Sequence, residues 1–89
     1  MRFKIFLHPK AAQFLEKADP TLSKRIKNRL RGLRVSPEKK GERLRYSNFW
    51  RLRIGNYRAI YEINVDERRV IILYIGRRRD VYDDFSKLL

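Results

Sequence analysis

The chain has no cysteine, so it can form neither disulfide bonds nor a thiolate zinc site. It has no apolar run near the ~18 residues that a membrane-spanning helix needs, and charges interrupt the apolar stretch within residues 1–10. We therefore expect no signal peptide, no membrane partner and a cytoplasmic location. Asp83 and Asp84 have no neighbouring ligand residues in the sequence, so we also expect no metal ion or other cofactor.

Acidic residues are few relative to basic ones: 10 Asp and Glu stand against 23 Lys and Arg among 89 residues, a net charge of +13. Such an excess favours a polyanionic partner, either a nucleic acid or an acidic protein. A thermophilic surface is a weaker explanation, because it would add acids as well as bases to form ion pairs. Every basic residue from Arg43 to Arg79 is an arginine. Arginine binds phosphate through two parallel hydrogen bonds, whereas lysine acts as a point charge.

The first half of the chain predicts one strand followed by two helices. Residues 2–8 alternate polar and apolar side chains as a strand does. Pro9 suits the first turn of a helix, and Asp19-Pro20 restarts one, with an aspartate N-cap before a proline. In the second helix the apolar residues form one continuous stripe: Leu22, Ile26, Leu30 and Leu33. Ser36-Pro37 ends this helix, and we expect residues 36–42 to form a loop.

The second half predicts three strands and a terminal helix. The strand-like runs are residues 49–54, 57–64 and 69–75, and the tail has Val81, Phe85 and Leu88 at helical spacing. The element order is therefore β-α-α-β-β-β-α. It predicts a single α+β domain over residues 1–89, with an antiparallel sheet, an N-terminal helical hairpin and a C-terminal helix.

Gly55-Asn56, between two strand-like runs, predicts a tight type II′ hairpin. Two loop residues fix the register, so Arg53 faces Arg58, and Arg51 lies two residues earlier on the same side. Like charges directly opposite each other are destabilising unless something anionic lies above them. The face formed by these three arginines is thus a candidate anion site; the alternative is that the arginines only extend into solvent.

A second basic segment, residues 76–79, is expected to reach the same place. If residues 65–68 form a four-residue turn, Asn64 pairs with Arg69 and Arg58 lies opposite Ile75. The arginines that follow then lie beside the start of the preceding strand, and Tyr82 comes one helical turn later. Guanidinium groups and a phenol around one concave patch would form a phosphate site capable of chemistry. The simpler alternative for Tyr82 is a core residue of an amphipathic helix.

Together these residues resemble the RelE family of toxin–antitoxin ribonucleases, over nearly the whole chain. The resemblance is carried by Arg-Leu-Arg-Ile-Gly-Asn-Tyr-Arg at 51–58, Ala-Ile-Tyr at 59–61 and Arg-Arg-Asp-Val-Tyr at 78–82. It implies a RelE-like toxin that enters the ribosomal A site and cleaves the mRNA there. It also implies a RelB-like antitoxin that blocks this site, in a heterodimer or heterotetramer.

The resemblance assigns the family's catalytic roles, by motif, to Arg51, Arg53, Arg58, Arg78 and Tyr82. We expect four further arginines to bind RNA: Arg43, Arg45, Arg77 and Arg79. Two departures from the family pattern matter, because lysine is common at the positions of Arg51 and Arg53, and histidine is common at that of Arg77. Both changes keep the charge but remove groups that can lose a proton.

RNA is cleaved when its 2′-hydroxyl attacks the adjacent phosphate, so a base must accept the hydroxyl proton. Arginine stays protonated in proteins, which leaves Tyr82 as the candidate base by elimination. Neighbouring guanidinium groups would favour its phenolate form. Arg53, Arg58 and Arg78 would bind the phosphate and stabilise the charge of the transition state, and the leaving-group acid would be Arg78 or an ordered water.

Two other functions fit the same sequence. A non-nuclease toxin similar to the ParE toxins, which inhibit DNA gyrase, would share the fold but generally lacks the terminal tyrosine and the full basic cluster. A non-catalytic RNA-binding protein would need the positive charge but not the clustered arginines with Tyr82. Trp50 and Tyr46 could stack on bases, although Trp50 faces away from the arginines in the predicted register.

Overall fold

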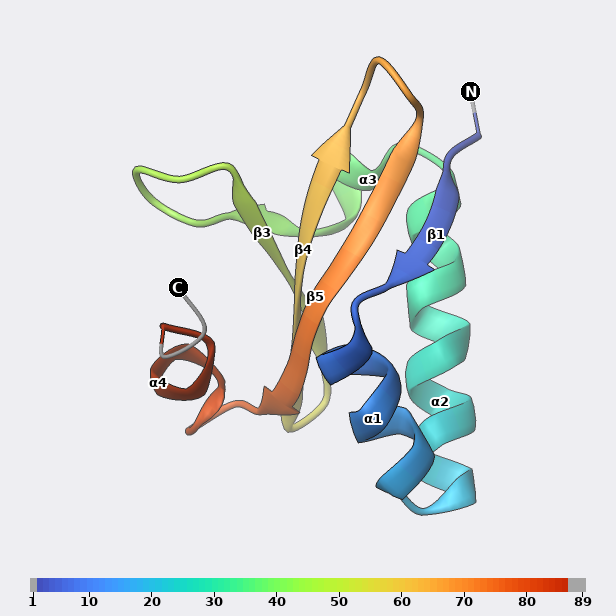
Figure 1. The fold of residues 1–89 in the computed structure, drawn as a ribbon, viewed down its shortest axis with the longest axis vertical. Helices are drawn as coiled ribbons and strands as arrows, with labels where there is room; N and C mark the ends of the chain where they lie inside the picture. Colours follow the sequence, from blue (N-terminus) through green and yellow to red (C-terminus); the bar gives the residue numbers. More distant parts are fainter. Residues whose placement is uncertain (1, 87–89) are drawn as a thin grey trace.

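A computed structural model describes residues 2–86 of the chain, except the side chain of Asp84. Five strands form one sheet in the order β1-β5-β4-β3-β2 (Figure 1). The strands are β1 (Lys4–Leu7), β2 (Glu42–Arg43), β3 (Phe49–Ile54), β4 (Tyr57–Asn64) and β5 (Arg69–Arg77). The helices are α1 (Pro9–Lys17), α2 (Pro20–Arg31), the 3-10 helix η1 (Gly32–Arg34), α3 (Pro37–Lys40) and α4 (Val81–Ser86). The predicted α+β class is confirmed, and the predicted helical position of Leu88 lies outside the described residues.

The sheet is mixed rather than wholly antiparallel. The pairs β2–β3, β3–β4 and β4–β5 are antiparallel, as predicted, whereas β1 runs parallel to β5. The parallel pairing follows from the helical hairpin, because the chain leaves β1, passes through α1 and α2, and returns to build the other strands before β5 reaches β1. The predicted loop over residues 36–42 also contains the short helix α3 and the start of the two-residue strand β2.

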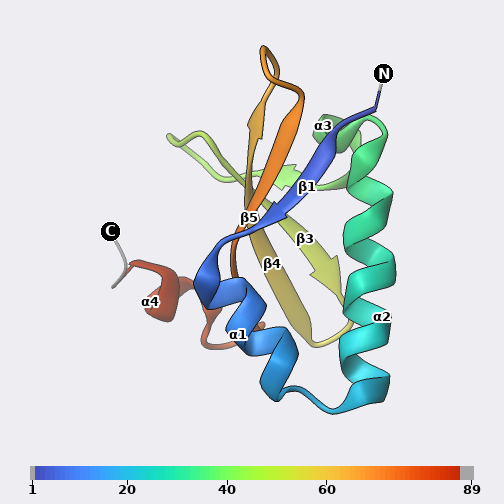
Figure 2. The ribbon, with the colours of Figure 1, turned by 45° about the vertical axis from the view of Figure 1, so that its right-hand side comes forward.

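Local signals begin both long helices where the sequence predicts. The side chain of Asp19 accepts hydrogen bonds from the backbone N–H groups of Thr21 (3.0 Å) and Leu22 (3.4 Å), so it satisfies two donors that the first turn of α2 leaves free. His8 caps α1 in the same way through Nδ1, which accepts a bond from Lys10 N. The connection between α1 and α2 is short, and the two helices cover the same face of the sheet (Figure 2).

Two apolar clusters occupy the two faces of the sheet. The larger one joins α1 and α2 to one face, and its buried residues include Ala11, Leu15, Ile26, Leu30, Leu52, Ile54, Ala59, Tyr61, Val70, Ile72 and Ile75. The smaller one joins α4 to the other face through Ile60, Val81 and Phe85. A six-residue helix is too short to be stable alone. Burying the Val81 and Phe85 side chains, at about 1.5–3 kcal/mol each, therefore holds α4 on the sheet.

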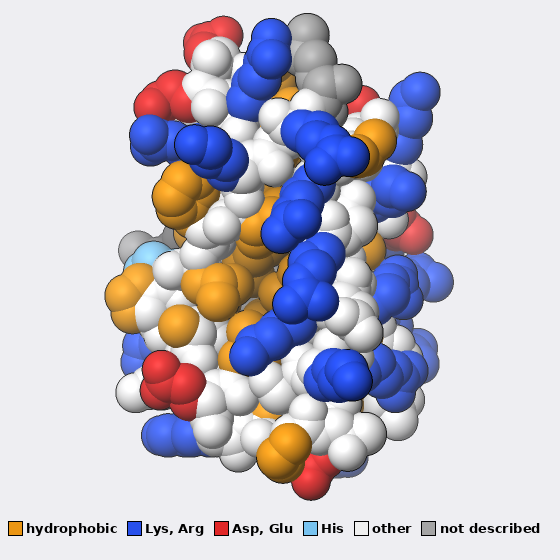
Figure 3. Space-filling model, turned by 90° about the vertical axis from the view of Figure 1, so that its right-hand side faces the viewer, with side chains coloured by type: hydrophobic (Ala, Val, Ile, Leu, Met, Phe, Trp, Pro, Cys, Tyr) orange, Lys and Arg blue, Asp and Glu red, His pale blue; other side chains and the backbone are white. Residues whose placement is uncertain are grey.

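Basic side chains remain on the surface outside both clusters. Figure 3 shows a row of Lys and Arg side chains beside an apolar hollow, on the side of the molecule where α2 lies. Helix α2 contains no acidic residue, and its exposed cations are Lys24, Arg25, Lys27, Arg29 and Arg31. Within residues 2–86, no helix is both long enough and apolar enough to cross a membrane.

Candidate active site

The β3–β4 hairpin holds three arginines on the face of the sheet that α4 covers. Gly55 has φ +59°, and Asn56 is not among the residues with positive φ, which is the pattern of a type II′ turn. Arg53 pairs with Arg58 and Arg51 pairs with Ile60. The predicted register is therefore confirmed. Leu52 and Ile54 point to the opposite face and belong to the larger core cluster, so the alternation of side chains directs the arginines away from it.

Helix α4 brings the Tyr82 phenol to these arginines. Arg51 Nη1 donates a hydrogen bond of 2.7 Å to Tyr82 Oη, and its guanidinium carbon lies 6.0 Å from the centre of the Tyr82 ring. The Tyr82 side chain is 37% exposed, so the phenol is at the surface and is not a core residue. Val81 and Phe85 form the buried side of the same helix. Their burial orients the helix so that Tyr82 points toward the arginines.

A carboxylate that the sequence analysis did not anticipate completes this group. Glu42 Oε2 accepts a hydrogen bond of 2.5 Å from Arg51 Nη2, and Glu42 Oε1 lies 3.5 Å from Arg53 Nη2. The hydrogen bond from Arg51, followed by the charge of Arg53, lowers the pKa of Glu42 below its ordinary value. The hydrogen bonds to Tyr82 and Glu42 raise the pKa of Arg51 in return. Glu42 stands directly opposite Arg51 in the β2–β3 pairing, but two residues are too few for a recognisable strand pattern.

Arg58 is the least exposed arginine of the cluster, at 8%. Its Nη1 donates to the carbonyl oxygens of Gly55 (2.8 Å) and Tyr57 (2.7 Å), so the turn itself fixes the guanidinium. Burial lowers the pKa of Arg58, and the positive charges of Arg53 and Arg78 lower it further. Arg78 directly follows β5, and its charge acts on Arg58. The positive charges of Arg53 and Arg78 repel that of Arg58, and an anion bound here would relieve the repulsion.

The predicted pairing between β4 and β5 is wrong by one residue near the site. Asn64 pairs with Arg69 as predicted, but a β-bulge near Ile60 and Tyr61 shifts the register, and Arg58 lies opposite Gly76 instead of Ile75. A bulge inserts one unpaired residue into a strand and so reverses the faces of all the residues beyond it. Consequently Arg77 is opposite Tyr57 and shares the face that carries α1 and α2.

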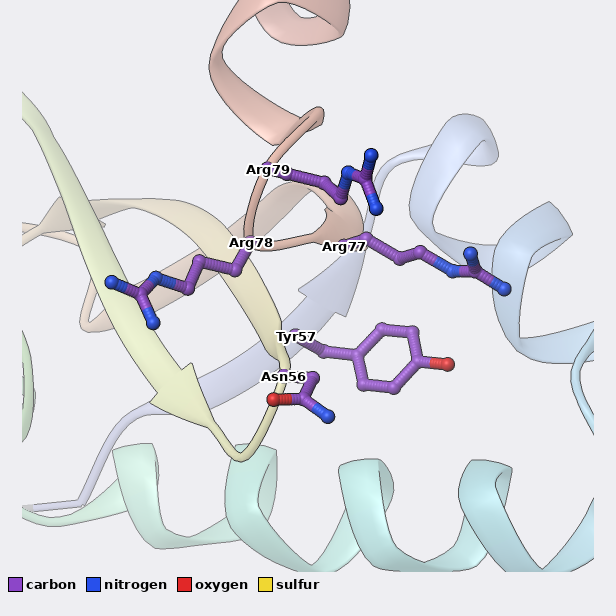
Figure 4. A pocket seen from close by; sticks show the side chains of 5 residues that line it. All are labelled: Asn56, Tyr57, Arg77, Arg78 and Arg79. Atoms are coloured by element: carbon purple, nitrogen blue, oxygen red, sulfur yellow. The ribbon is translucent and has the colours of Figure 1, made fainter.

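The structure separates the three consecutive arginines that the sequence analysis grouped together. Figure 4 shows Arg78 pointing to one side of the chain, and Arg77 and Arg79 pointing to the other side with Tyr57. The latter side chains line a cavity of about 610 Å³ together with Asn56 and Arg78.

Arg43 and Arg45 lie in β2 and the loop that follows it. Arg43 Nε donates to the carbonyl oxygen of Ser47 (3.0 Å), and its Nη2 lies 3.5 Å from Asn48 Oδ1. The Arg45 guanidinium lies 5.2 Å from the ring centre of Tyr46, which is 93% exposed. The site therefore consists of two parts: a cluster formed by Glu42, Arg51, Arg53, Arg58, Arg78 and Tyr82, and outlying arginines around it.

Comparison with solved structures identifies the class of fold as that of toxins from toxin–antitoxin complexes. A chain of the RelBE2 toxin–antitoxin complex from Mycobacterium tuberculosis is similar to this one, with a TM-score of 0.81 and 25% identity over 90% of this chain and 95% of that chain. A mutant of the E. coli toxin RelE in the free state has a TM-score of 0.80 and 19% identity over 100% and 99% of the two chains, which is a likeness of fold alone.

Sequence comparison then assigns the family. A protein named "Putative toxin RelE1" from Methanocaldococcus jannaschii is 31% identical over 87 residues, which cover 92% of this chain and 97% of that protein. The family model described as the ParE toxin of the type II toxin–antitoxin system, parDE, matches residues 5–82. This chain belongs to that toxin family, within the RelE/ParE superfamily.

Proposed function

We propose that this chain is a ribosome-dependent mRNA endoribonuclease, the toxin of its toxin–antitoxin pair, and that it acts as a single RelE-like domain. The observation that carries the proposal is the contact between Arg51 and the phenol of Tyr82, on the sheet face that also presents Arg53 and Arg58. A phenol that only packed in the core would not be exposed beside several guanidinium groups.

The chemistry follows from what each group can donate or accept. The phenolate form of Tyr82, whose Oη accepts a hydrogen bond from Arg51, takes the proton of the RNA 2′-hydroxyl. The 2′-oxygen then bonds to phosphorus, and the bond from phosphorus to the 5′-oxygen breaks. Arg53, Arg58 and Arg78 stabilise the extra negative charge on the phosphate oxygens. A proton from Arg78 or an ordered water reaches the leaving 5′-oxygen.

Glu42 holds the arginines in place before RNA arrives. Its carboxylate accepts a hydrogen bond from Arg51 and faces Arg53, and its lowered pKa makes it a weaker proton acceptor than an ordinary glutamate. We therefore assign the base role to Tyr82 and a positioning role to Glu42. An RNA phosphate entering the cluster would compete with the carboxylate for Arg53, whose ion pair is the longer of the two.

Replacing Tyr82 with phenylalanine tests the proposal. Tyr82→Phe removes the oxygen that accepts the proton but keeps the ring, so cleavage of ribosome-bound mRNA should fall by about 10²- to 10⁴-fold. The measurement is the rate of mRNA cleavage by purified toxin on programmed ribosomes. Tyr46→Phe is the matched control, because it makes the same chemical change at an exposed loop residue and should leave the rate unchanged. Unchanged cleavage by Tyr82→Phe would remove the phenol from the mechanism.

Inhibition of DNA gyrase is the second candidate function, because the matching family model is that of the ParE toxin. The two functions separate in one experiment. A nuclease cleaves mRNA only when ribosomes are present and loses toxicity with Tyr82→Phe. A gyrase inhibitor blocks supercoiling by purified gyrase and remains toxic with the same substitution, and that result would reverse our choice.

The partners proposed for this chain are a RelB-like antitoxin and the ribosome. Support for the antitoxin comes from the solved relative, which is part of a toxin–antitoxin complex. A heterodimer or heterotetramer would form in the cytoplasm, where ribosomes are found. Growth arrest on expression of this chain, relieved by the protein encoded beside it, tests the pairing, and the mass of the co-purified complex gives its stoichiometry.

A further inference from the structure

A second basic site lies on the opposite side of the sheet from the cluster around Tyr82. Its main residues are Tyr57 and Arg77, which pair across β4 and β5 and share the face that carries α1 and α2. Together with Asn56, Arg78 and Arg79 they line the cavity of about 610 Å³ shown in Figure 4. We call this cavity the Arg77 pocket. Arg78 also acts on Arg58 electrostatically, so it stands between the pocket and the cluster.

The part of the chain that the structure describes leaves the positive charges of the Arg77 pocket without a carboxylate partner. Within residues 2–86, leaving Asp84 aside, no carboxylate forms an ion pair with Arg77, Arg78 or Arg79. The guanidinium of Arg25 in α2 does not line the pocket but lies nearby, because a Cβ atom added to Gly55, the residue before Asn56, would meet it. Exposed like charges this close together repel one another, and a bound anion would relieve the repulsion.

The remaining groups of the pocket match a nucleotide better than an isolated phosphate. The half-buried Tyr57 ring is held by Phe14 in an edge contact, with ring centres 5.9 Å apart and planes at 64°. Unpaired bases bind to proteins by stacking on fixed aromatic rings and on guanidinium planes. The Asn56 amide offers both a donor and an acceptor for a base edge. The volume also lies in the range of sites that hold small organic ligands, about 300–1,000 Å³.

We propose that the Arg77 pocket is a second RNA subsite, which binds a nucleotide further along the strand than the two that flank the scissile phosphate. The RNA strand passes from the cluster around the end of the β3–β4 hairpin, where Arg78 and Asn56 lie, to the face that carries α1 and α2. The backbone of Arg78 is fixed at this crossing, since its N–H donates to the carbonyl oxygen of Asn56 at 2.8 Å. This inference rests on the proposed nuclease function, since it extends the path of the same strand.

The test compares RNA probes of two lengths, a dinucleotide and a hexanucleotide, both with 2′-O-methyl groups that prevent cleavage. Only the longer probe can occupy the cluster and the pocket together, so wild-type protein should bind it at least about tenfold more tightly. Arg77→Gln should remove most of this gain, and Tyr57→Leu should weaken hexanucleotide binding by about tenfold. Arg34→Gln is the matched control, because it loses the same charge beyond the C-terminal end of α2. Fluorescence polarisation measures each affinity.

The outcomes separate this inference from the proposed function. The subsite is wrong if Arg77→Gln keeps the gain with length, or if Arg34→Gln loses as much as Arg77→Gln. It is also wrong as a nucleotide site if a hexaglutamate peptide binds as tightly as the RNA and loses as much affinity with Tyr57→Leu. If the wild type cleaves mRNA and any of these results is found, the proposed nuclease function is retained and only the subsite is rejected. Tyr57→Leu protein is first checked for a wild-type unfolding midpoint, and Arg77→Gln, at an exposed residue, does not depend on that check.

Discussion

At the scale of single residues, Glu42 is the acidic member of the cluster around Tyr82. It supplies the anion that the opposed Arg53 and Arg58 lack, and it does so from the strand on the far side of Arg51. The arginines themselves could be predicted from the sequence, because a tight hairpin converts sequence positions into faces. The carboxylate could not, because its position depends on a two-residue strand at the edge of the sheet.

Because Arg51 and Arg53 lower the pKa of Glu42, part of the stability of the protein depends on pH. A lowered pKa in the folded state means that the stabilisation is present above the ordinary pKa of 4.5 and is lost as the pH falls through the lowered value. In urea unfolding, the difference in unfolding free energy between wild type and Glu42→Gln should therefore shrink from about pH 6 to about pH 3. Glu16→Gln, at an exposed position of α1, is the control for the charge change. A difference that stays constant over this range would show that the ion pairs do not stabilise the fold.

Inside the core, the pKa of Tyr61 is also shifted by the environment of its side chain. Its side chain is fully buried, and its hydroxyl donates to the carbonyl oxygen of Pro37 at 2.9 Å. Burial raises the pKa of Tyr61 to about 12. This hydrogen bond ties the start of α3 to the middle of β4, and it thereby supports the segment that leads into Glu42.

At the scale of elements, the position of the short strand β2 depends on Gly41, whose backbone lies very close to residues of β3 and β4. A Cβ atom there would overlap the Tyr61 hydroxyl and the carbonyl oxygen of Arg51. Gly41 has φ −119° and ψ −173°, so the backbone conformation is ordinary and only the lack of space requires glycine. The requirement links β2 to β3 and β4 at the point where Glu42 enters the cluster.

Gly41→Ala should therefore lower the free energy of unfolding by about 1–3 kcal/mol, as overpacking does elsewhere. Urea unfolding provides the measurement. Gly32→Ala is the matched control, because nothing lies within 4 Å of an added Cβ and the backbone is helical, with φ −61° and ψ −21°. The control should be neutral or stabilising by about 0.4–1 kcal/mol. Equal stability of the two variants would contradict the close approach.

The elements that could be predicted are those fixed by local chemistry. Asp19-Pro20 begins α2 and Gly55-Asn56 forms the hairpin, because each signal acts within a few residues. The parallel pairing of β1 with β5 depends instead on how the chain returns after the helical hairpin. The bulge in β5 depends on packing, since both Leu73 and Tyr74 contact the cluster under α4 while Ile72 and Ile75 contact the larger core.

At the scale of the whole molecule, the net charge of +13 is spread over both sides of the sheet. The cluster around Tyr82 lies on one side, and the Arg77 pocket and the exposed cations of α2 lie on the other. The sequence analysis predicted a polyanionic partner but placed all three consecutive arginines on one side. Composition fixes the total charge, whereas the register of β5 decides on which face each charge appears.

Binding of single-stranded RNA should therefore weaken steeply with salt. Each neutralised phosphate contributes a slope of about −0.7 to a plot of log affinity against log salt, so contacts from about four arginines predict a slope of roughly −3. Titrations of the uncleavable hexanucleotide over a range of KCl concentrations measure it. Substituting both Arg53 and Arg77 with glutamine should make the slope shallower by about half. A slope near zero would mean that RNA binding does not use these charges.

The single extra residue in β5 decides on which face of the sheet each later residue of the strand lies. Deleting one residue at Leu73 would remove the bulge, return the strand to regular alternation and leave Tyr74, Ile75 and Arg77 on the faces they occupy now. Regular alternation with Leu73 retained would instead exchange the two faces from Tyr74 onward, turning Arg77 toward the phenol and Ile75 out of the core. A three-base deletion at Leu73 should therefore leave the arginines distributed as they are, whereas a change that straightens β5 at its full length would move several side chains to the opposite face at once.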